Sequence, residues 1–348
     1  MPFHKCRCMF IPPYVLDRMA RSEREEVRKS ALETVRQSTA VRLKRTDKEK
    51  EISKMLYATA PPGQGKRLVY DCQNKWELRV SLERKEGDPA TSDDDVNKAY
   101  QYAGIVRDYL KKVLGRNSWD NNGKDIIANV HRGVNYNNAF WDGDEFAAGD
   151  GDGIIFIGLA RSLDVVAHEF GHGIVQSTAN LDYYSQSGAL NEHFADVFGT
   201  VITQYAEKQD EKTADWLIGN EIMGPELYGE ALRSMAAPGE AYDNTIMGKD
   251  PQPAHMDNYY SGPGDNRGVH INSGIPNKAF YLFAKERGTE TAARIWYHAL
   301  QNLWSKAYFN DAVEVIAESA RTLIKAGKVT EGSPQTVRWA FRKVGLPM

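Results

Sequence analysis

The stretch His168-Glu169-Phe170-Gly171-His172 decides the fold and most of the chemistry of this chain. Positions i and i+4 of a helix lie one above the other on the same face. Two imidazoles placed in this way can bind one zinc ion, and the glutamate between them can reach a water molecule beside the metal. Val165-Val166 and Ile174-Val175 flank the motif and predict a buried helix, in which two ordinary histidines without a partner would be costly.

A third ligand is expected from the segment 188–199, because a catalytic zinc ion takes three protein ligands and leaves a fourth position open. Glu192 and Asp196 are four residues apart, so they share one helical face among apolar neighbours. Acids in such surroundings are rarely buried unless they are paired. We predict that Glu192 is the third ligand and that Asp196 accepts the free ring N–H of a ligand histidine. A pair of solvent-facing acids is the alternative.

Together these motifs resemble the thermolysin family of zinc endopeptidases, in which H-E-x-x-H precedes a helix that bears the third glutamate. Further similar blocks follow the family order at 135–141, 149–153, 232–235 and 268–275. The resemblance implies an α+β fold of two lobes, β-rich in the N-terminal lobe and mainly α-helical in the C-terminal lobe. The expected divisions are a pro-segment with its cleavable linker, the β-rich lobe, and the zinc helix with the helical lobe, at 1–55, 56–160 and 161–348.

The resemblance also implies a role for each site residue. Glu169 becomes the general base, which later protonates the leaving amine. Tyr184 and His270 match side chains that donate hydrogen bonds to the tetrahedral oxyanion, and Asp265 matches the acid that orients His270. A surface histidine is the alternative for His270. The implied zinc ligands are His168, His172 and Glu192.

Substrate binding follows from the same resemblance. Asn138 and Ala139 match positions that pair with the substrate backbone, as if the peptide were an added strand at a sheet edge. Arg233 matches the residue that binds a substrate carbonyl. An apolar pocket is implied, so we expect cleavage before a bulky hydrophobic residue such as Leu or Phe. Its wall, for which ordinary core packing is the alternative, would consist of Phe156, Leu159, Val165 and Leu232.

Calcium binding is where the chain departs from the family. Asp164 and Asp215 match two calcium ligands of thermolysin, but Thr203, Leu217 and Asn220 stand at the other matching positions. A hard cation that takes about 6–8 oxygen ligands would be poorly served there. We therefore expect one catalytic zinc ion and weak or absent structural calcium.

The N-terminal leader is basic. Residues 1–50 contain 13 Lys/Arg and 7 Asp/Glu, a net charge of +6, whereas the whole chain carries −3. This contrast favours an electrostatic fit between leader and body. Pro12-Pro13 favours an extended conformation, and residues 17–44 predict a helix.

The motif Pro12, Pro13, Tyr14 resembles the pro-segment of the protealysin subgroup. The resemblance implies an intramolecular inhibitor that proteolysis removes at an exposed linker, so that the mature enzyme begins near residues 50–60. A solvated basic tail with no regulatory role is the alternative.

Three cysteines do not build a disulfide framework. Cys6 and Cys8 shortly precede Pro12, so a pro-segment thiolate could take the open zinc position. Two reduced thiols without such a role are the preferred interpretation. Cys72 is expected to be a packing residue.

Composition agrees with a soluble enzyme, because 41% of residues are hydrophobic and no apolar run reaches membrane-spanning length. The leader does not resemble a secretory signal peptide, and its basic surplus lacks the aromatic interleaving of a nucleic-acid-binding surface. We expect a monomer that cleaves peptides and unfolded proteins outside the cell, with the cytoplasm as the alternative location.

Other functional classes remain open from the sequence. A zinc-bearing module without activity is disfavoured because Glu169, Tyr184 and His270 are all present. An interaction protein with a functional leader would lack zinc. An exopeptidase is disfavoured because the edge strand at 137–141 suits a cleft that is open at both ends.

Overall fold

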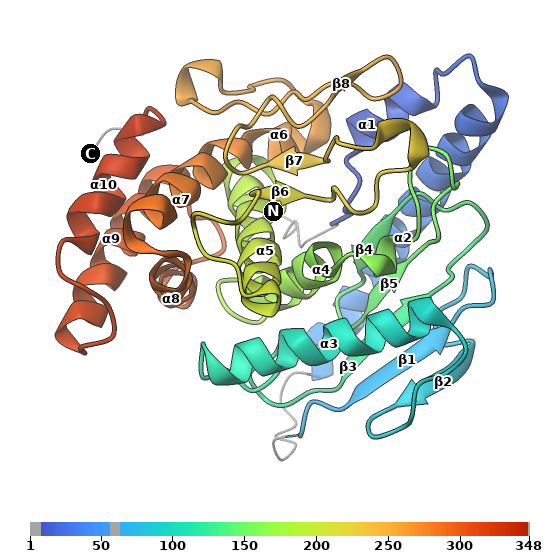
Figure 1. Ribbon diagram of the computed structural model, residues 1–348, viewed down its shortest axis with the longest axis horizontal. Coiled ribbons are helices and arrows are strands. Elements are labelled where there is room, and N and C mark those ends of the chain that lie inside the picture. The colour runs from blue at the N-terminus through green and yellow to red at the C-terminus, as the bar shows by residue number, and fades with distance from the viewer. Residues whose placement is uncertain (1–7, 56–62, 347–348) are drawn as a thin grey trace.

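The computed structural model describes residues 8–55 and 63–346, and for residues 43–55 it describes the backbone alone. Figure 1 shows a β-rich N-terminal lobe, a mainly helical C-terminal lobe and an N-terminal segment (residues 8–55) that lies against both. The two-lobe α+β architecture expected from the sequence is confirmed.

A mixed five-stranded sheet forms the N-terminal lobe, in the order β2-β1-β3-β5-β4. Strands β1, β3 and β5 are parallel, whereas β2 and β4 run antiparallel to their neighbours. Strand β4 is therefore an edge strand with backbone groups available for pairing. The bounds are β1 (Arg67–Asp71), β2 (Ser81–Lys85), β3 (Ile126–Val130), β4 (Ala139–Trp141) and β5 (Phe146–Ala148).

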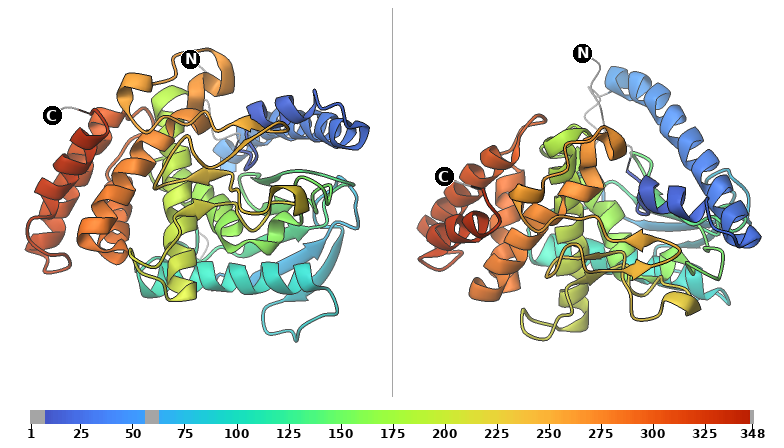
Figure 2. Two further views of the ribbon diagram at one scale, coloured as in Figure 1. Left: turned by 45° about the horizontal axis from the view of Figure 1, so that its top comes forward. Right: turned by 90° about the horizontal axis from the view of Figure 1, so that it is seen from above.

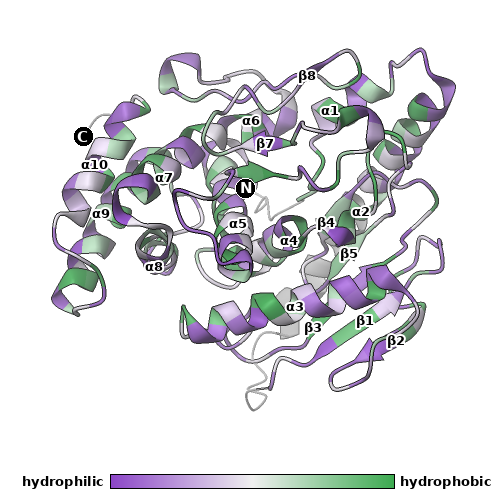
Figure 3. Ribbon diagram, in the orientation of Figure 1, coloured by the Kyte–Doolittle hydropathy of each residue, from purple (hydrophilic) through white to green (hydrophobic). Residues whose placement is uncertain are grey.

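Helix α3 (Asp94–Lys112) packs on β1 and β3 and covers one face of the sheet (Figure 2). Its N-cap, Asp93, accepts hydrogen bonds from the backbone N–H groups of Asp95 and Val96, which satisfies donors that a helix start leaves unpaired. Figure 3 shows hydrophilic and hydrophobic segments alternating along α3, as expected for a helix with one buried face.

Two helices form the N-terminal segment, α1 (Pro13–Met19) and α2 (Glu25–Met55). The prediction of one helix at 17–44 is therefore wrong in its bounds and in its continuity, because two helices separated at residues 20–24 stand in its place. Pro12 is extended as predicted, but Pro13 starts α1, because proline fits the first helical turn, where no N–H partner is needed. Helix α2 continues through most of the expected linker, and residues 56–62 lie outside the described part of the chain.

The C-terminal lobe is built on α4 (Leu163–Gln176) and α5 (Ser185–Glu207), which pack side by side (Figure 1). Gly171 allows this close approach, since a Cβ there would lie 2.9 Å from the Ala195 Cα. The remaining helices are α6 (Gly264–Asn272), α7 (Gly274–Arg287), α8 (Thr289–Leu300), α9 (Phe309–Lys325) and α10 (Ser333–Lys343).

Short elements complete the lobe. Strands β6 (Leu217–Ile218) and β7 (Arg233–Ser234) pair, as do β8 (Asp243–Asn244) and β9 (Gly248–Lys249). Single 3₁₀ turns occur at Leu159–Arg161, Pro225–Leu227 and Met256–Asn258. None of the helices among the described residues is both long and apolar enough to cross a membrane.

Candidate active site and metal centre

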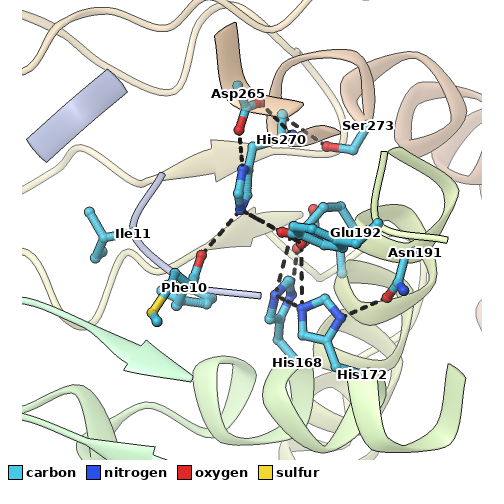
Figure 4. Close-up of polar contacts among 12 residues, drawn as sticks. Phe10, Ile11, His168, His172, Asn191, Glu192, Asp265, His270 and Ser273 are labelled. Atoms are coloured by element: carbon cyan, nitrogen blue, oxygen red, sulfur yellow. Dashed lines mark hydrogen bonds and ion pairs between the residues drawn. The ribbon is translucent and has the colours of Figure 1, made fainter. Parts of the chain in front are cut away.

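The two histidines of the zinc motif face each other on α4. Both side chains are fully buried, and their Nε2 atoms lie 3.0 Å apart (Figure 4). Glu192 on α5 points its carboxylate at the same spot, with oxygens 3.7 Å from His168 Nε2 and 3.5 Å from His172 Nε2. In a tetrahedral zinc site with bonds of about 2.0–2.3 Å, donor atoms lie roughly 3.3–3.8 Å apart. The two nitrogen–oxygen spacings fall in this range and the nitrogen–nitrogen spacing lies slightly below it, so the three donors converge on one point at which a zinc ion would be bound.

The outer nitrogens explain why a cation is needed. Asn191 donates from Nδ2 to the Leu181 carbonyl, so its Oδ1 faces His172 Nδ1 at 2.8 Å and that nitrogen carries the proton. His168 Nδ1 lies 2.8 Å from Asp196 Oδ1 and carries its proton for the same reason. Both Nε2 atoms then present lone pairs to each other beside a carboxylate. A bound divalent cation relieves this repulsion, so the donor set fits the zinc ion expected from the sequence.

Asp196 also holds Arg233. The guanidinium donates to both carboxylate oxygens at 2.9–3.2 Å, and Asn277 Nδ2 donates at 2.9 Å. Burial raises the pKa of Asp196, but the charge of Arg233 and the hydrogen bond from His168 outweigh it and hold that pKa below its usual range. The residue thus stays a carboxylate, as its predicted position beside a ligand histidine requires. Sequence reasoning missed Asn191 and Asn277, because neither asparagine stands in a spacing that marks a metal site.

His270 enters the site through a left-handed turn. Residues 265–268 all have positive φ, between 53° and 79° except for 47° at Asn266, a conformation costly for three side-chain-bearing residues. The turn brings Asp265 back onto His270, whose backbone N–H and Nδ1 lie 2.7 and 2.6 Å from its carboxylate. Burial lowers the pKa of His270, but the charges of Glu192 and Asp265 outweigh it and raise that pKa. The structure therefore brings Asp265 and His270 together as predicted.

Tyr183, not Tyr184, reaches the site. The Tyr183 hydroxyl donates to Glu192 and lies 3.1 Å from His270 Nε2, whereas the Tyr184 side chain is 41% exposed. The choice of Tyr184 was wrong because neighbouring residues in extended backbone point to opposite sides, and two adjacent tyrosines look alike in sequence. Burial, followed by the charge of Glu192, raises the pKa of Tyr183 well above its ordinary value, so the phenol stays protonated.

The N-terminal segment lies beside the metal ligands and pairs with residues of both lobes. The Phe10 N–H donates to the Ala139 carbonyl at 3.0 Å, and Arg233 Nη1 donates to the Phe10 carbonyl at 3.3 Å. Asn138 pairs with Ile11 twice, accepting from its N–H at 2.9 Å and donating to its carbonyl at 3.3 Å. The Met9 carbonyl lies 3.1 Å from His270 Nε2. Figure 4 shows Phe10 and Ile11 beside His270 and the two histidines of the zinc motif. Phe10 and Ile11 thus use the residues predicted to bind substrate.

The Phe10 ring is fully buried among site residues. It lies edge-on to the His168 ring at 5.1 Å and under the Arg233 guanidinium at 4.8 Å. A Cβ at Gly219 would touch the same ring at 3.2 Å. The four predicted pocket residues are buried in the hydrophobic core that also contains Phe10, namely Phe156, Leu159, Val165 and Leu232.

Residues after Phe10 also hold the N-terminal segment in place through contacts with the rest of the protein. Pro12 accepts the first backbone hydrogen bonds of α1, and Tyr14 packs against the core, where burial raises its pKa well above the ordinary value. Along α2, the buried hydroxyls of Ser30, Thr34 and Ser38 lie at four-residue intervals on one helical face. They contact Asp152, the Asn137 N–H and the Tyr136 hydroxyl.

Asp164 and Asp215, the two residues that match calcium ligands of thermolysin, differ in burial. Asp164 is buried and already accepts hydrogen bonds from Ser162, Val165 N–H and Gly219 N–H. Asp215 is exposed and accepts from the Leu217 N–H at 3.0 Å. Both carboxylates thus accept hydrogen bonds from nearby groups of the protein.

The cysteines differ from the preferred prediction. Cys8 is buried and disulfide-bonded, so the interpretation as a reduced thiol is wrong for this residue; Cys6 lies outside the described residues. A single disulfide needs only two cysteines, so the lack of a framework of several disulfides did not exclude a disulfide at Cys8. Cys72 is free and buried next to β1, as expected, and burial raises the pKa of its thiol to about 12.

Comparisons with known proteins match most of the described chain. Residues 22–176 match the family model "Thermolysin metallopeptidase, catalytic domain", and residues 179–346 match "Thermolysin metallopeptidase, alpha-helical domain". An "Extracellular metalloprotease" of Pectobacterium carotovorum subsp. carotovorum is 43% identical over 296 residues, which cover 84% of each chain. "Protease PrtS" of a Photorhabdus species is 40% identical and covers 83% of this chain and 80% of its own.

A solved structure agrees along nearly the full length. The "Precursor of Protealysin, Metalloproteinase from Serratia proteamaculans" has a TM-score of 0.86 and 37% identity, over 97% of this chain and 99% of its own. "Thermolysin" of Alicyclobacillus acidocaldarius subsp. acidocaldarius is 37% identical over 80% of this chain, which spans 50% of that relative's length.

Proposed function

Since this chain belongs to the thermolysin family of metallopeptidases, it is a zinc-dependent endopeptidase made as a precursor, and we propose that Glu169 is the base of its peptide hydrolysis. Glu169 is fully buried on α4 between the two ligand histidines His168 and His172. Zinc held by these histidines and Glu192 would acidify a water molecule and polarise the peptide carbonyl. Glu169 takes the proton from the attacking water and later gives it to the leaving amine.

Two side chains stabilise the negative charge that develops on the carbonyl oxygen. The Tyr183 hydroxyl and His270 Nε2 lie 3.1 Å from each other, and His270 also lies 3.1 Å from the Met9 carbonyl of the pro-segment. His270 Nε2 already faces a peptide carbonyl oxygen, which limits reorganisation during the reaction, whereas the Tyr183 hydroxyl, which donates to Glu192 here, turns to reach the oxyanion. Asp265 positions His270 by accepting a hydrogen bond from its Nδ1–H, so that Nε2 faces the substrate. In the imidazolium form Nε2 also carries a proton, which it donates to the oxyanion.

The pro-segment is proposed to inhibit by occupying the substrate path. Phe10 and Ile11 make four backbone-directed hydrogen bonds with Ala139, Asn138 and Arg233, as a substrate strand would. The buried Phe10 ring supports a preference for a bulky hydrophobic residue after the cleaved bond. We propose that cleavage near residues 50–60 releases the pro-segment and that the enzyme acts on peptides outside the cell, as the name of the Pectobacterium relative suggests.

The observation that carries the function is the convergence of His168, His172 and Glu192 within 3.0–3.7 Å. The test is Glu169→Ala, with Glu207→Ala at the exposed end of α5 as a matched control. We expect Glu169→Ala to retain one zinc ion per chain but to lose cleavage of an end-blocked peptide and self-processing of the leader. Glu207→Ala should keep all three. Retained cleavage in Glu169→Ala would reject this base, and cleavage restricted to peptides with free ends would favour an exopeptidase.

A further inference from the structure

The Cys8 sulfur lies against the metal centre. Its side chain is fully buried and packs with Tyr183 and Val269. The Cys8 Sγ, one ligand nitrogen of His172 and one carboxylate oxygen of Glu192 all lie within 4.8 Å of one another. A pro-segment residue thus brings a soft donor atom to the side of the site where Tyr183 and His270 converge.

The neighbouring backbone makes this placement informative. His270 holds the Met9 carbonyl, and Ala139 and Arg233 hold Phe10, so the Met9–Phe10 peptide bond lies along the cleft with a hydrophobic residue after it. Because the pro-segment binds as a substrate would, some feature of the precursor must prevent hydrolysis of the Met9–Phe10 bond. Hydrolysis requires a water molecule in the fourth position of the zinc ion. A sulfur atom bound in that position would exclude the water.

We propose that the Cys8 thiolate is the fourth ligand of the zinc ion in the reduced precursor, and that oxidation of Cys8 to a disulfide removes this ligand. The inference rests on the proposed zinc site. Thiolate sulfur is a strong zinc ligand, whereas a disulfide sulfur carries no charge and has lost its affinity for the metal. The structure, in which Cys8 is disulfide-bonded, corresponds to the oxidised state.

The redox step balances with a low-molecular-weight disulfide as oxidant. The Cys8 thiolate leaves the zinc ion and attacks one sulfur of the oxidant, which forms a mixed disulfide and releases one small thiolate. A second cysteine thiolate, for which the sequence offers Cys6, then attacks the Cys8 sulfur and releases the second small thiolate. Two protein thiols are oxidised and one small disulfide is reduced to two thiols. Reducing compartments therefore favour the zinc-bound thiolate, and oxidising ones favour its loss.

The test uses the full-length precursor in a Glu169→Ala background, which prevents self-processing, with cobalt(II) in place of zinc. Absorption spectra report the site directly, because a thiolate bound to cobalt adds an intense near-ultraviolet charge-transfer band to the weak visible bands of a tetrahedral ion. Spectra are compared after reduction and after treatment with oxidised glutathione. The variants are Cys8→Ser and, as a matched control, Cys72→Ser, which removes the buried free thiol next to β1.

We expect the charge-transfer band in the reduced precursor and in reduced Cys72→Ser, and at least a tenfold weaker band after oxidation and in Cys8→Ser. The comparison of reduced with oxidised parent needs no variant, so a misfolded Cys8→Ser would not blunt the test. Tetrahedral visible bands without the charge-transfer band in the reduced parent would overturn the role of Cys8 and leave the zinc site intact. Absence of the visible bands altogether would overturn the proposed metal site, and this inference with it.

Discussion

Removal of the Phe10 side chain should unlock the precursor. Phe10 is fully buried beside His168 and Arg233, and it becomes exposed when the pro-segment leaves the cleft. A Phe→Ala change in such a site costs about 3–5 kcal/mol, because apolar burial is lost and a cavity remains. The backbone hydrogen bonds to Ala139 and Arg233 persist, so we take about 3 kcal/mol as the loss in docking free energy. At about 1.4 kcal/mol per tenfold, the undocked population rises roughly 10²-fold.

The assay is the initial rate on a short fluorogenic peptide, recorded while gels show that the precursor is intact. Phe10→Ala should raise this rate by about two orders of magnitude, up to the limit set by the mature enzyme. Leu32→Ala is the matched control, since Leu32 is a pro-segment side chain that is 53% exposed. Equal latency of the Phe10→Ala, Leu32→Ala and parent precursors, with equal thermal stability, would refute the reasoning that this ring holds the pro-segment in place.

Other perturbations test separate parts of the molecule. In the mature enzyme, Tyr183→Phe should lower kcat/KM by about 10²-fold through loss of an oxyanion donor, whereas Tyr184→Phe should stay within about twofold; the reverse order would restore the assignment from sequence. A hydrogen bond that His131 donates to Asp150, against the opposing effect of burial, raises the pKa of His131 to about 9. The stabilisation from protonated His131 is therefore complete below the unfolded value near 6.5 and is lost as pH rises through about 9. Urea titrations at pH 6.5 and 9.5 should therefore show that the free energy of unfolding falls by about 1 kcal/mol more in the parent than in His131→Asn, after allowance for solvent screening. An equal fall in the two proteins would contradict this assignment. Addition of about 1 mM calcium to dialysed enzyme should move Tm by less than about 2 °C, because a protein with a functional calcium site gains RT ln(1 + [L]/Kd) and would shift further.

Local spacing accounts for the parts of the site that were predictable from sequence. His168 and His172 share a helical face by the 3.6-residue period, and Glu192 and Asp196 do so on the next helix, so each pair needs only its own helix to form. Chemistry then requires the two pairs to meet, because buried imidazoles and carboxylates need partners. The edge position of Ala139 and the contact of Arg233 with a peptide carbonyl came from resemblance alone, since nothing local marks them.

Other features depend on contacts between distant parts of the chain. Whether Tyr183 or Tyr184 enters the site depends on the backbone at the start of α5, where Ser185 has φ 54°. The left-handed turn at 265–268 persists only because Asp265 accepts three hydrogen bonds from His270 and Ile271. The break between α1 and α2 lies where the pro-segment turns from the cleft towards the sheet edge. Helical periodicity does not register any of these constraints.

The Arg233–Asp196 pair joins substrate recognition to metal binding. Both side chains are almost fully buried, so each charge depends on the other, and loss of one partner from such a pair costs about 3–5 kcal/mol. Asp196 uses the same carboxylate oxygen to hold His168 Nδ1, and Arg233 uses another nitrogen to hold the Phe10 carbonyl. The guanidinium that receives the peptide is therefore fixed by the acid that orients a zinc ligand. A substitution at either residue is therefore expected to change both substrate binding and zinc binding. The pro-segment binds an Arg233 side chain whose position is already fixed for catalysis by Asp196.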